Sequence, residues 1–412
     1  MNPRRVVVTG LGVISPVGND INTFWSSLIR GVCGIDFITH FDTEAYKVKI
    51  AAEVKGFDPL EYMDKSEARR ADRFTQFALA AATQAVLDSG IEGKVAAERF
   101  GVYIGSGVGG ICTMAEQEDK LSAGGPRKVS PLLIPMMIGN IAGGNVAIRF
   151  GAEGPCLPVV TACATGTNAI GEAMRAIQWG EADAILAGGT EAAIMPLAIA
   201  GFTNCMALST REDIHSASIP FDARRDGFVM GEGAGVLVLE EYGHAVARGA
   251  KIYAELSGYG HFCDAYHMTS PHPEGTGAAR AIEKAAKEAG ALREKSLYIN
   301  AHGTSTPLND KGETAAIKAA LGLERAYATK ISSTKSMTGH MLGAAGAVEA
   351  IAAILALREG ILPPTIGYLE KDEECDLDYI PNAAQKAAVD VAMSVSLGFG
   401  GHNACVAFTK EG

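Results

Sequence analysis

The sequence predicts an α/β protein in which two similar halves stack strands and helices in layers. Short apolar runs rich in β-branched residues end at glycine turns, and they alternate with alanine-rich segments whose apolar residues recur at helical spacing. The alternation starts again after Glu240 and Glu241, which indicates an internal duplication. With 412 residues, 48% of them hydrophobic, the chain is long enough for the two halves to build a large core.

The first half opens with a strand over residues 4–10 that runs into glycine turns. A packed helix is predicted over residues 69–87, where apolar residues lie at helical spacing and Gly90 follows as a stop signal. Residues 100–104 are predicted to form a buried strand, and the glycine-rich loop 105–110 comes directly after it. A phosphate-binding loop is a rival interpretation, but this loop lacks the GK[ST] ending of a P-loop.

The remaining elements follow the same alternation. The first half continues with a strand end, a helix and two strands, predicted over residues 159–162, 164–179, 184–187 and 235–239. The second half repeats helix and strand three times, over residues 278–289, 298–300, 313–321, 331–333, 343–357 and 404–408. We place the boundary near residues 241–257 and divide the chain into halves 1–250 and 251–412.

Charge and cysteine content narrow the class of protein. A formal net charge of −11 argues against a general nucleic-acid binder, because Lys and Arg on phosphates supply most of that affinity. No uninterrupted apolar run reaches the roughly 18–20 residues that span a bilayer, so we expect no membrane insertion. The eight cysteines form no CxxC pair, and the N-terminus carries no secretory signal. We therefore expect reduced thiols in the cytoplasm.

Residues 159–169 place Cys163 where a predicted strand gives way to a helix, among small neighbours. Free N–H groups and the positive end of the helix dipole favour a thiolate at such a place, and small neighbours leave room for a substrate. A cysteine nucleophile is therefore one interpretation. The alternative is a small buried hydrophobe, since free cysteine is among the most buried residue types.

Two further segments carry histidines. His302 follows the strand 298–300, and the C-terminal ends of strands usually face the crevice where α/β folds bind ligands. His340 follows Lys335 across a glycine turn, close enough in the chain to share a site, and the next helix contains Glu349. Each residue also has an ordinary interpretation, as a satisfied structural histidine, a surface lysine or a capping histidine.

Residues 394–403 form a predicted strand that breaks into a glycine-flanked turn around Phe399. Glycines on both sides would let the backbone N–H of Phe399 point into a site as a donor to an oxyanion. An ordinary hairpin turn is the alternative.

Taken together and in this order, the four segments resemble the β-ketoacyl synthases, and in detail they are similar to the elongating enzymes of type II fatty acid synthesis. The resemblance runs from residues 6–12 to residues 398–401, so it covers nearly the whole chain. It implies a thiolase-like fold, with duplicated βαβαβαββ halves in a five-layered αβαβα arrangement, usually as a homodimer.

The resemblance also implies the reaction, which joins an acyl group to malonyl-acyl-carrier-protein, releases CO₂ and forms 3-oxoacyl-acyl-carrier-protein. Cys163 would take the acyl group as a thioester, and the N–H groups of Cys163 and Phe399 would hold its carbonyl oxygen. His302 and His340 would donate to the enolate that decarboxylation leaves, which is a task for neutral imidazoles.

The family also assigns substrate contacts. Thr304 and Thr306 match positions that contact the pantetheine arm, although turn capping is the alternative for both hydroxyls. Val108 matches a residue that gates the acyl pocket, and Phe399 matches the gate beside the cysteine. Phe202 matches a residue that lines the same pocket. Val108 is smaller than the isoleucine expected there. Two other departures from the usual family residues touch no reacting atom: Leu397, where phenylalanine is common, and His402, where threonine is frequent.

Lys335 would fix the environment of His340, and Glu349 would pair with Lys335. The resemblance implies no required cofactor. Relatives hold a monovalent cation, and the matching residues here are Asn300, Glu349 and Ser394.

The expected partner is acyl carrier protein, loaded with acyl or malonyl groups. Carrier protein is acidic, so basic islands on this acidic chain would steer its docking through a local field. A solvated helix face is the alternative for these islands, which consist of Lys65, Arg69, Arg70, Arg127 and Lys128.

Three rival functions share this fold. A thiolase uses coenzyme A thioesters and a second cysteine as base, but Cys405 lies within an apolar strand where a core role is expected. A silent chain-length partner subunit would lack the nucleophile, and Cys163 is present. A discrete polyketide ketosynthase has the same site chemistry. The amino-acid sequence of residues 163–168, CATGTN, favours fatty acid elongation over this alternative.

Overall fold

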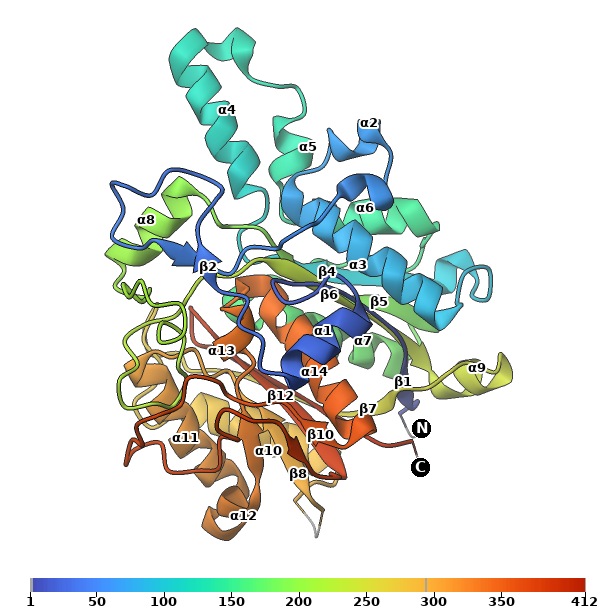
Figure 1. Ribbon diagram of the computed structural model, residues 1–412. Coiled ribbons are helices and arrows are strands. Elements are labelled where there is room, and N and C mark those ends of the chain that lie inside the picture. The colour runs from blue at the N-terminus through green and yellow to red at the C-terminus, as the bar shows by residue number, and fades with distance from the viewer. Residues whose placement is uncertain (1–2, 293–294, 412) are drawn as a thin grey trace.

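The computed structural model describes residues 3–292 and 295–411, and its elements follow the predicted alternation (Figure 1). The strands are β1 (Val6–Ile14), β2 (Asp36–Phe37), β3 (Ile50–Ala51), β4 (Phe100–Gly105), β5 (Ala184–Glu191), β6 (Gly233–Glu241), β7 (Ala254–Cys263), β8 (Leu297–Asn300), β9 (Lys330–Ser332), β10 (Ile361–Leu362), β11 (Gln385–Lys386), β12 (Val391–Gly398) and β13 (His402–Thr409).

The α-helices are α1 (Ile21–Ile29), α2 (Lys65–Ala68), α3 (Arg73–Ser89), α4 (Ile111–Gly124), α5 (Leu133–Met137), α6 (Ile141–Phe150), α7 (Thr165–Gln178), α8 (Pro196–Asn204), α9 (Tyr242–Ala247), α10 (Thr276–Glu288), α11 (Pro307–Leu321), α12 (Leu323–Ala328), α13 (Lys335–Thr338) and α14 (Ala345–Glu359). Short 3₁₀ turns cover Pro59–Glu61, Ala97–Arg99, Pro126–Lys128, Ala162–Ala164 and Leu342–Ala344.

The sheet topology confirms the predicted duplication. Nine strands form one sheet in the order β4-β5-β6-β1-β7-β13-β12-β8-β9. In each half a parallel pair is followed by two antiparallel ones, as β4-β5-β6-β1 in the first half and β8-β12-β13-β7 in the second. The halves join where β1 pairs with β7 through Val7–Glu255 and Val8–Ala254. The proposed division at residues 250–251 falls between α9 and β7 and stays a prediction.

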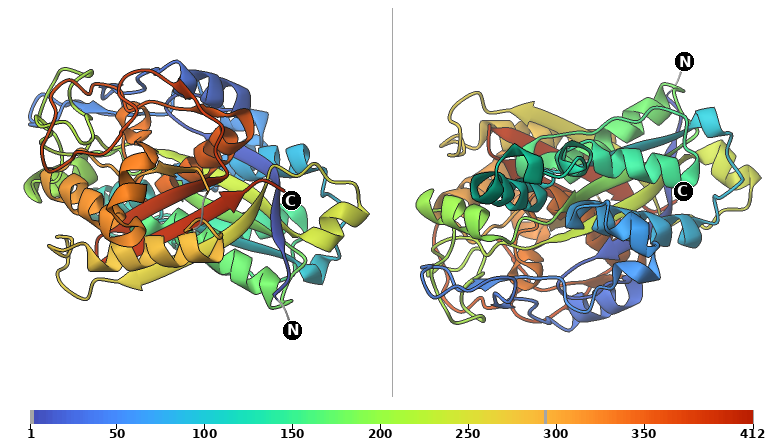
Figure 2. Two further views of the ribbon diagram at one scale, coloured as in Figure 1. Left: turned by 90° about the horizontal axis from the view of Figure 1, so that it is seen from below. Right: turned by 90° about the horizontal axis from the view of Figure 1, so that it is seen from above.

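Helices cover both parts of the sheet and also lie between them, which gives the five predicted layers (Figures 1 and 2). Helices α3 and α6 pack on the outer face of the first half, and α10 and α11 on that of the second. The central layer is α7 and α14, whose apolar side chains join one core with both parts of the sheet. Burial on all sides explains why α14 is built mainly of alanine and branched aliphatic residues.

Two predicted helix starts were wrong by four residues or more. The helix predicted over residues 313–321 begins at Pro307. The helix predicted from residue 69 begins at Arg73, because the Asp72 carboxylate caps it by accepting the Phe74 N–H, and residues 65–68 form the separate helix α2. The predicted stop signal is confirmed, since α3 ends at Ser89 and Gly90 follows it in the left-handed conformation with φ 59°.

The strand predicted to end over residues 159–162 does not form. This segment runs beside the outermost strand β4, where one bridge between Val102 and Cys156 stands in place of a fifth strand of the first half, the counterpart of β9. Its apolar side chains are partly at the surface, with Leu157 51% and Val160 57% exposed. The apolar β-branched residues therefore correctly predicted an extended backbone. They could not show that this segment has no neighbouring strand with which to form a full ladder of hydrogen bonds.

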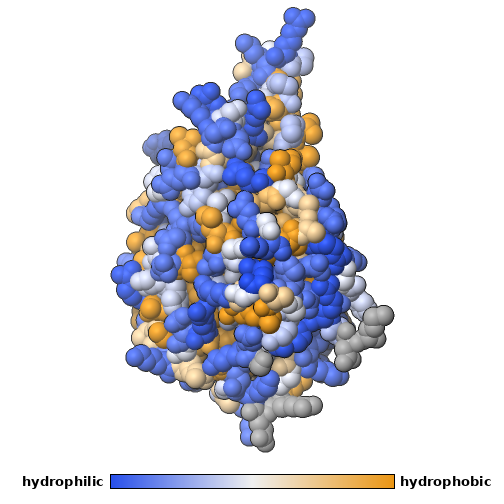
Figure 3. All heavy atoms as spheres, turned by 90° about the vertical axis from the view of Figure 1, so that its right-hand side faces the viewer, coloured by the Kyte–Doolittle hydropathy of each residue, from blue (hydrophilic) through white to orange (hydrophobic). Residues whose placement is uncertain are grey.

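The eight cysteines are all free thiols, as predicted. Over the described part of the chain, no helix combines the length and apolar character that crossing a membrane requires. The face shown in Figure 3 carries scattered apolar residues among hydrophilic ones.

The contact between β1 and α3 leads to a stability prediction. A Cβ added at Gly12 would lie 1.9 Å from the carbonyl oxygen of Ala81 on α3, so Gly12→Ala is expected to lower the free energy of unfolding by about 3 kcal/mol. The control is Gly312→Ala in α11, where a Cβ meets nothing within 4 Å and helix propensity predicts a gain of about 0.5–1 kcal/mol. Denaturant unfolding followed by circular dichroism measures both changes. Equal stability of the two variants would contradict the close packing of β1 on α3.

Candidate active site

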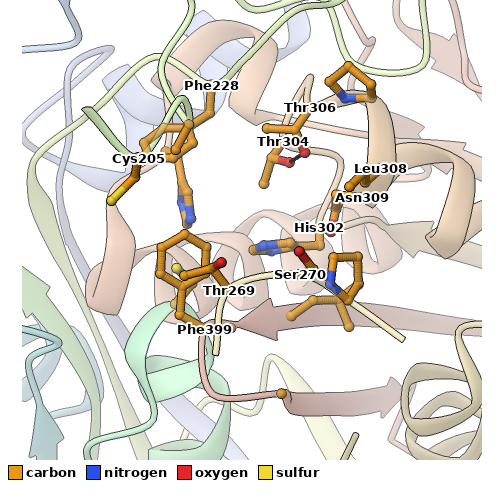
Figure 4. A pocket seen from close by; sticks show the side chains of 18 of the residues that line it. Cys205, Phe228, Thr269, Ser270, His302, Thr304, Thr306, Leu308, Asn309 and Phe399 are labelled. Atoms are coloured by element: carbon orange, nitrogen blue, oxygen red, sulfur yellow. Dashed lines mark hydrogen bonds between the residues drawn. The ribbon is translucent and has the colours of Figure 1, made fainter. Parts of the chain in front are cut away.

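One pocket collects the predicted chemical residues from both halves of the chain (Figure 4). Cys163 lies in the 3₁₀ turn that leads into α7, and His302 follows β8. His340 comes after α13, and Phe399 lies in the hairpin between β12 and β13. The other predicted residues in its wall are Phe202, Thr304 and Thr306.

The turn that carries Cys163 is held in an unusual backbone conformation. Ala162 has φ 49°, in the left-handed region that residues with a Cβ rarely adopt. The hairpin after β12 approaches this turn closely, since a Cβ at Gly398 would lie 2.8 Å from the carbonyl oxygen of Thr161. Glycine at 398 therefore lets the hairpin lie against this turn, and the backbone N–H groups of Phe399 and Cys163 act to lower the pKa of the Cys163 thiol.

The protonation state of Cys163 differs from the sequence-based expectation. Burial raises the pKa of its thiol to about 12, although the charge of Lys335 and the N–H groups of Phe399 and Cys163 act in the opposite direction. The N–H groups therefore act in the predicted direction, but burial has the larger effect on the pKa and favours the neutral thiol. Desolvation outweighs the favourable hydrogen bonds, because the surrounding side chains include the apolar Phe202.

The two histidines lie together and are neutral. Their ring centroids are 5.2 Å apart with the rings nearly perpendicular, and both side chains are buried. Burial lowers the pKa of His302 and of His340 well below the usual value, and the positive charge of Lys335 lowers both further. The backbone holds each in place, because the His302 N–H donates to Glu313 at 2.7 Å and the His340 N–H to the carbonyl oxygen of Val229 at 2.7 Å.

Lys335 and Glu349 form the predicted ion pair, and both are buried. Lys335 does not belong to the pocket wall, so it acts on the histidines through its field. Burial raises the pKa of Glu349 to about 7, and the charge of Lys335 opposes this shift. A buried pair of this kind is costly to break because the remaining charge has no compensation.

The three predicted cation ligands present buried oxygens without partners. Among the described residues, no hydrogen bond reaches Asn300 Oδ1, Glu349 Oε2 or Ser394 Oγ. Asn300 and Ser394 face each other across the parallel strands β8 and β12, and Lys335 binds the other oxygen of Glu349. Unsatisfied buried oxygens are costly, so this donor set fits a small cation.

The predicted substrate contacts fall into two groups. Thr304 and Thr306 line the pocket with their hydroxyl oxygens 2.9 Å apart, and the ring of Phe202 lies 6.3 Å from that of Phe399. Val108 does not belong to the described wall of this pocket. It lies in the loop after β4 and is 44% exposed. The structure thus gathers four of the five predicted contacts.

The predicted docking residues are all exposed. They lie on and after α2 and in the turn after α4, at the end of the molecule from which α4 projects (Figure 1), and they comprise Lys65, Arg69, Arg70, Arg127 and Lys128.

Other residues in the pocket wall escaped sequence analysis. They include the loop residues Asp264, Thr269, Ser270 and Pro271 and the amides of Asn309 and Asn403. No periodicity marks a loop that enters a pocket. Glu313 also went unassigned, although an acidic residue within a buried helix face is a usable signal: its carboxylate accepts the N–H groups of His302 and Gly303.

The cysteines distinguish this site from a thiolase site. Cys405 is fully buried in β13 within the outer core of the second half, as predicted. Cys205 lines the pocket, but it is exposed and its sulfur points away from the centre (Figure 4).

Comparison with known proteins yields one family. Residues 3–245 match the N-terminal domain of β-ketoacyl synthase and residues 253–369 match its C-terminal domain. The chain is 53% identical over 408 residues to a protein of Staphylococcus aureus named 3-oxoacyl-[acyl-carrier-protein] synthase 2, covering 99% of this chain and 98% of that one. A protein of the same name from Synechocystis sp. is 52% identical over 413 residues, covering 100% and 99%.

Solved structures show the same fold. A ketosynthase from a type II polyketide system, solved in complex with its acyl carrier protein, matches with a TM-score of 0.92 at 37% identity, over 100% of both chains. A β-ketoacyl synthase from Burkholderia phymatum matches with a TM-score of 0.91 at 34% identity, over 99% of this chain and 100% of that one.

The raised pKa of Cys163 predicts how its labelling depends on pH. Below its pKa the thiolate fraction grows about tenfold per pH unit, so the rate of carbamidomethylation by iodoacetamide is expected to rise without levelling from about pH 7 to about pH 10. Mass spectrometry of the peptide that contains Cys163 measures this rate, and Cys163→Ser provides the unlabelled control. A plateau near neutral pH would mean that the thiolate already predominates there.

Proposed function

The chain belongs to the β-ketoacyl synthase family, and we propose that it elongates fatty acyl chains on acyl carrier protein by decarboxylative condensation with malonyl-acyl-carrier-protein. The observation that carries the proposal is the meeting of Cys163, His302 and His340 in one pocket. Relatives that are about half identical over their full length bear the name 3-oxoacyl-[acyl-carrier-protein] synthase 2, which supports the fatty acid pathway and this partner.

In the first step the sulfur of Cys163 attacks the thioester carbonyl of an acyl-carrier-protein. The bond from carbonyl carbon to the pantetheine sulfur breaks, the acyl group stays on Cys163, and the thiol proton ends on the released pantetheine sulfur. The N–H groups of Cys163 and Phe399, which already favour negative charge on this sulfur, donate to the oxyanion that develops beside it.

In the second step malonyl-carrier-protein loses CO₂, and the electrons of the broken C–C bond form an enolate. The enolate carbon attacks the acyl-Cys163 carbonyl, the C–S bond breaks with its electrons on the sulfur, and a proton from solvent restores the thiol. His302 and His340 are neutral, so each has a single ring N–H to donate, and two such donors stabilise the enolate oxygen. Lys335 helps to keep both rings neutral, because its charge lowers their pKa.

The pocket wall suits a pantetheine arm and an acyl chain at different points. The paired hydroxyls of Thr304 and Thr306 match the amides of pantetheine. Phe202 and Phe399 offer apolar surface beside the nucleophile, so we assign them to the acyl chain together with Val108. We assign docking of the acidic carrier protein to Lys65, Arg69, Arg70, Arg127 and Lys128.

A homodimer suits the end of the sheet at β4. Strand β4 ends the nine-stranded order, and the extended segment beside it exposes Leu157 and Val160. The neighbouring helices α4 and α5 expose Met114 and Ile134. Exposed apolar side chains gathered at this end of the sheet are suited to pairing with a second copy of the chain. The free cysteines support a cytoplasmic setting.

The alternative of a polyketide-type ketosynthase rests on the fold match at 37% identity, which is below that of the fatty acid relatives. A thiolase is disfavoured, because Cys405 lies in the core and Cys205 at the rim of the pocket.

We also propose that Asn300, Glu349 and Ser394 hold a monovalent cation, whose charge would offset that of the buried carboxylate. Replacing tetramethylammonium chloride by potassium chloride at equal ionic strength is expected to raise the melting temperature by roughly 2–4 °C. Ser394→Ala removes one oxygen from this set and leaves the pair of Lys335 with Glu349 intact, so its melting temperature should not respond. An equal rise in the variant would contradict this site.

The condensing function is tested by separating its two steps. Intact-protein mass spectrometry after mixing with long-chain acyl-carrier-protein is expected to show one acyl adduct on the wild type and none on Cys163→Ala. His302→Ala and His340→Ala should keep the adduct but discharge it with malonyl-carrier-protein at least about 100-fold more slowly, because each loses an enolate donor. An adduct on another cysteine, or no adduct on the wild type, would overturn the proposed function.

A further inference from the structure

A buried carboxylate beside the active site has no part in the chemistry described above. Glu191 ends strand β5 and is fully buried. Its Oε1 accepts the Ser106 hydroxyl at 2.6 Å and the Val108 N–H at 3.3 Å. Its Oε2 accepts the Gly107 N–H at 2.8 Å and the Gly343 N–H at 3.0 Å. One side chain thus ties together two segments that lie in different halves of the chain.

Both segments touch the turn of the nucleophile. Leu342–Ala344 is the second-half counterpart of the turn Ala162–Ala164, since each is a 3₁₀ turn before a central helix and Leu342 has φ 47° where Ala162 has φ 49°. Gly343 stands where the first half has Cys163. A Cβ added at Gly107 would lie 2.7 Å from Glu191 Oε2 and 3.6 Å from the carbonyl oxygen of Ala162. The loop of residues 106–108 therefore lies against both turns and leaves no room for side chains around the carboxylate.

The same loop sets the position of an apolar wall behind the nucleophile. Helix α4 begins at Ile111, directly after the loop. Ile111, Cys112 and Ala115 belong to one apolar cluster with Cys163 and Phe202. A shift of the loop would therefore move apolar side chains that share a cluster with Cys163.

We propose that Glu191 is a positioning residue for acyl-chain selection, which holds the loop 106–108 and the start of α4 at a fixed distance from the acyl group on Cys163. The proposal rests on the proposed function, because it concerns the acyl group of that reaction. Glu191 acts through Val108 and α4 and touches no reacting atom.

The variant Glu191→Gln tests this assignment selectively. With its amide nitrogen at the Oε1 position, glutamine keeps the acceptor for Gly107 and Gly343, and the Ser106 hydroxyl turns to accept from the new NH₂ group. The Val108 N–H loses its acceptor, and so does the proton of the Ser106 hydroxyl, which bound the same oxygen. The substitution therefore removes the hydrogen bond that holds Val108, the predicted gate of the acyl pocket, and preserves the hydrogen bond to Gly343 that links the two halves.

The measured quantity is the single-turnover rate of acyl transfer to Cys163, from short-chain and long-chain acyl-carrier-protein separately. We expect the ratio of the two rates to change by roughly five- to tenfold in Glu191→Gln, the effect of one lost hydrogen bond. The matched control is Glu240→Gln, a fully buried carboxylate of β6 that binds Thr9 and Arg248 at 2.7–2.9 Å. Its ratio should equal that of the wild type.

Parallel changes of both rates in Glu191→Gln, or an unchanged ratio, would overturn the assignment and leave Glu191 a purely structural residue. If Glu191→Gln does not fold, Ser106→Ala is measured in the same way, since it removes the shortest bond of the same carboxylate, and an unchanged ratio again overturns the assignment. Failure of the wild type to accept any acyl group would instead overturn the proposed function, so the two failures are distinguishable.

Discussion

Helices α7 and α14 touch each other with almost no side chain between them, in the layer that separates the two parts of the sheet. A Cβ added at Gly166 would lie 2.7 Å from the backbone nitrogen of Ala347, and one at Gly346 would lie 2.1 Å from Thr167 Oγ1. This approach brings the turns before the two helices together, and with them Cys163 from one half and the segment after His340 from the other. The composite active site therefore depends on glycines that no reaction step uses.

Burial has opposite consequences for the charged and the neutral groups of the site. It disfavours the thiolate of Cys163 and the protonated forms of both histidines. The side chains that face the pocket are therefore mainly neutral. The buried ionisable groups behind the pocket wall include the pair of Lys335 and Glu349 and the carboxyl groups of Glu191 and Glu313. The backbone N–H groups and the neutral imidazoles are thus already in place to donate to the negative charge that develops during the reaction. Because these donors bind the developing charge more strongly than the uncharged substrate, they stabilise the transition state relative to the ground state.

Sequence patterns predicted the layered architecture well, and their errors have local causes. The alternation of strands and helices and its restart after Glu241 follow from period and composition, and the sheet order confirmed both. The start of α3 was misplaced because Asp72, its cap, lies inside a stretch that is helical in period. The strand at residues 159–162 was wrong because strand propensity reports a fit to a pleated surface and not the presence of a neighbour.

The sequence by itself determined the fold class, the duplication and the residue types that meet in the pocket, because these depend on local period and on short motifs. Only the tertiary structure decided which groups are desolvated and which hydrogen bonds remain. The neutral thiol of Cys163, the unpartnered oxygens near Ser394 and the four bonds of Glu191 all arise from contacts between segments far apart in the chain. Desolvation is a property of everything that surrounds a group in space, and no run of neighbours along the chain specifies it.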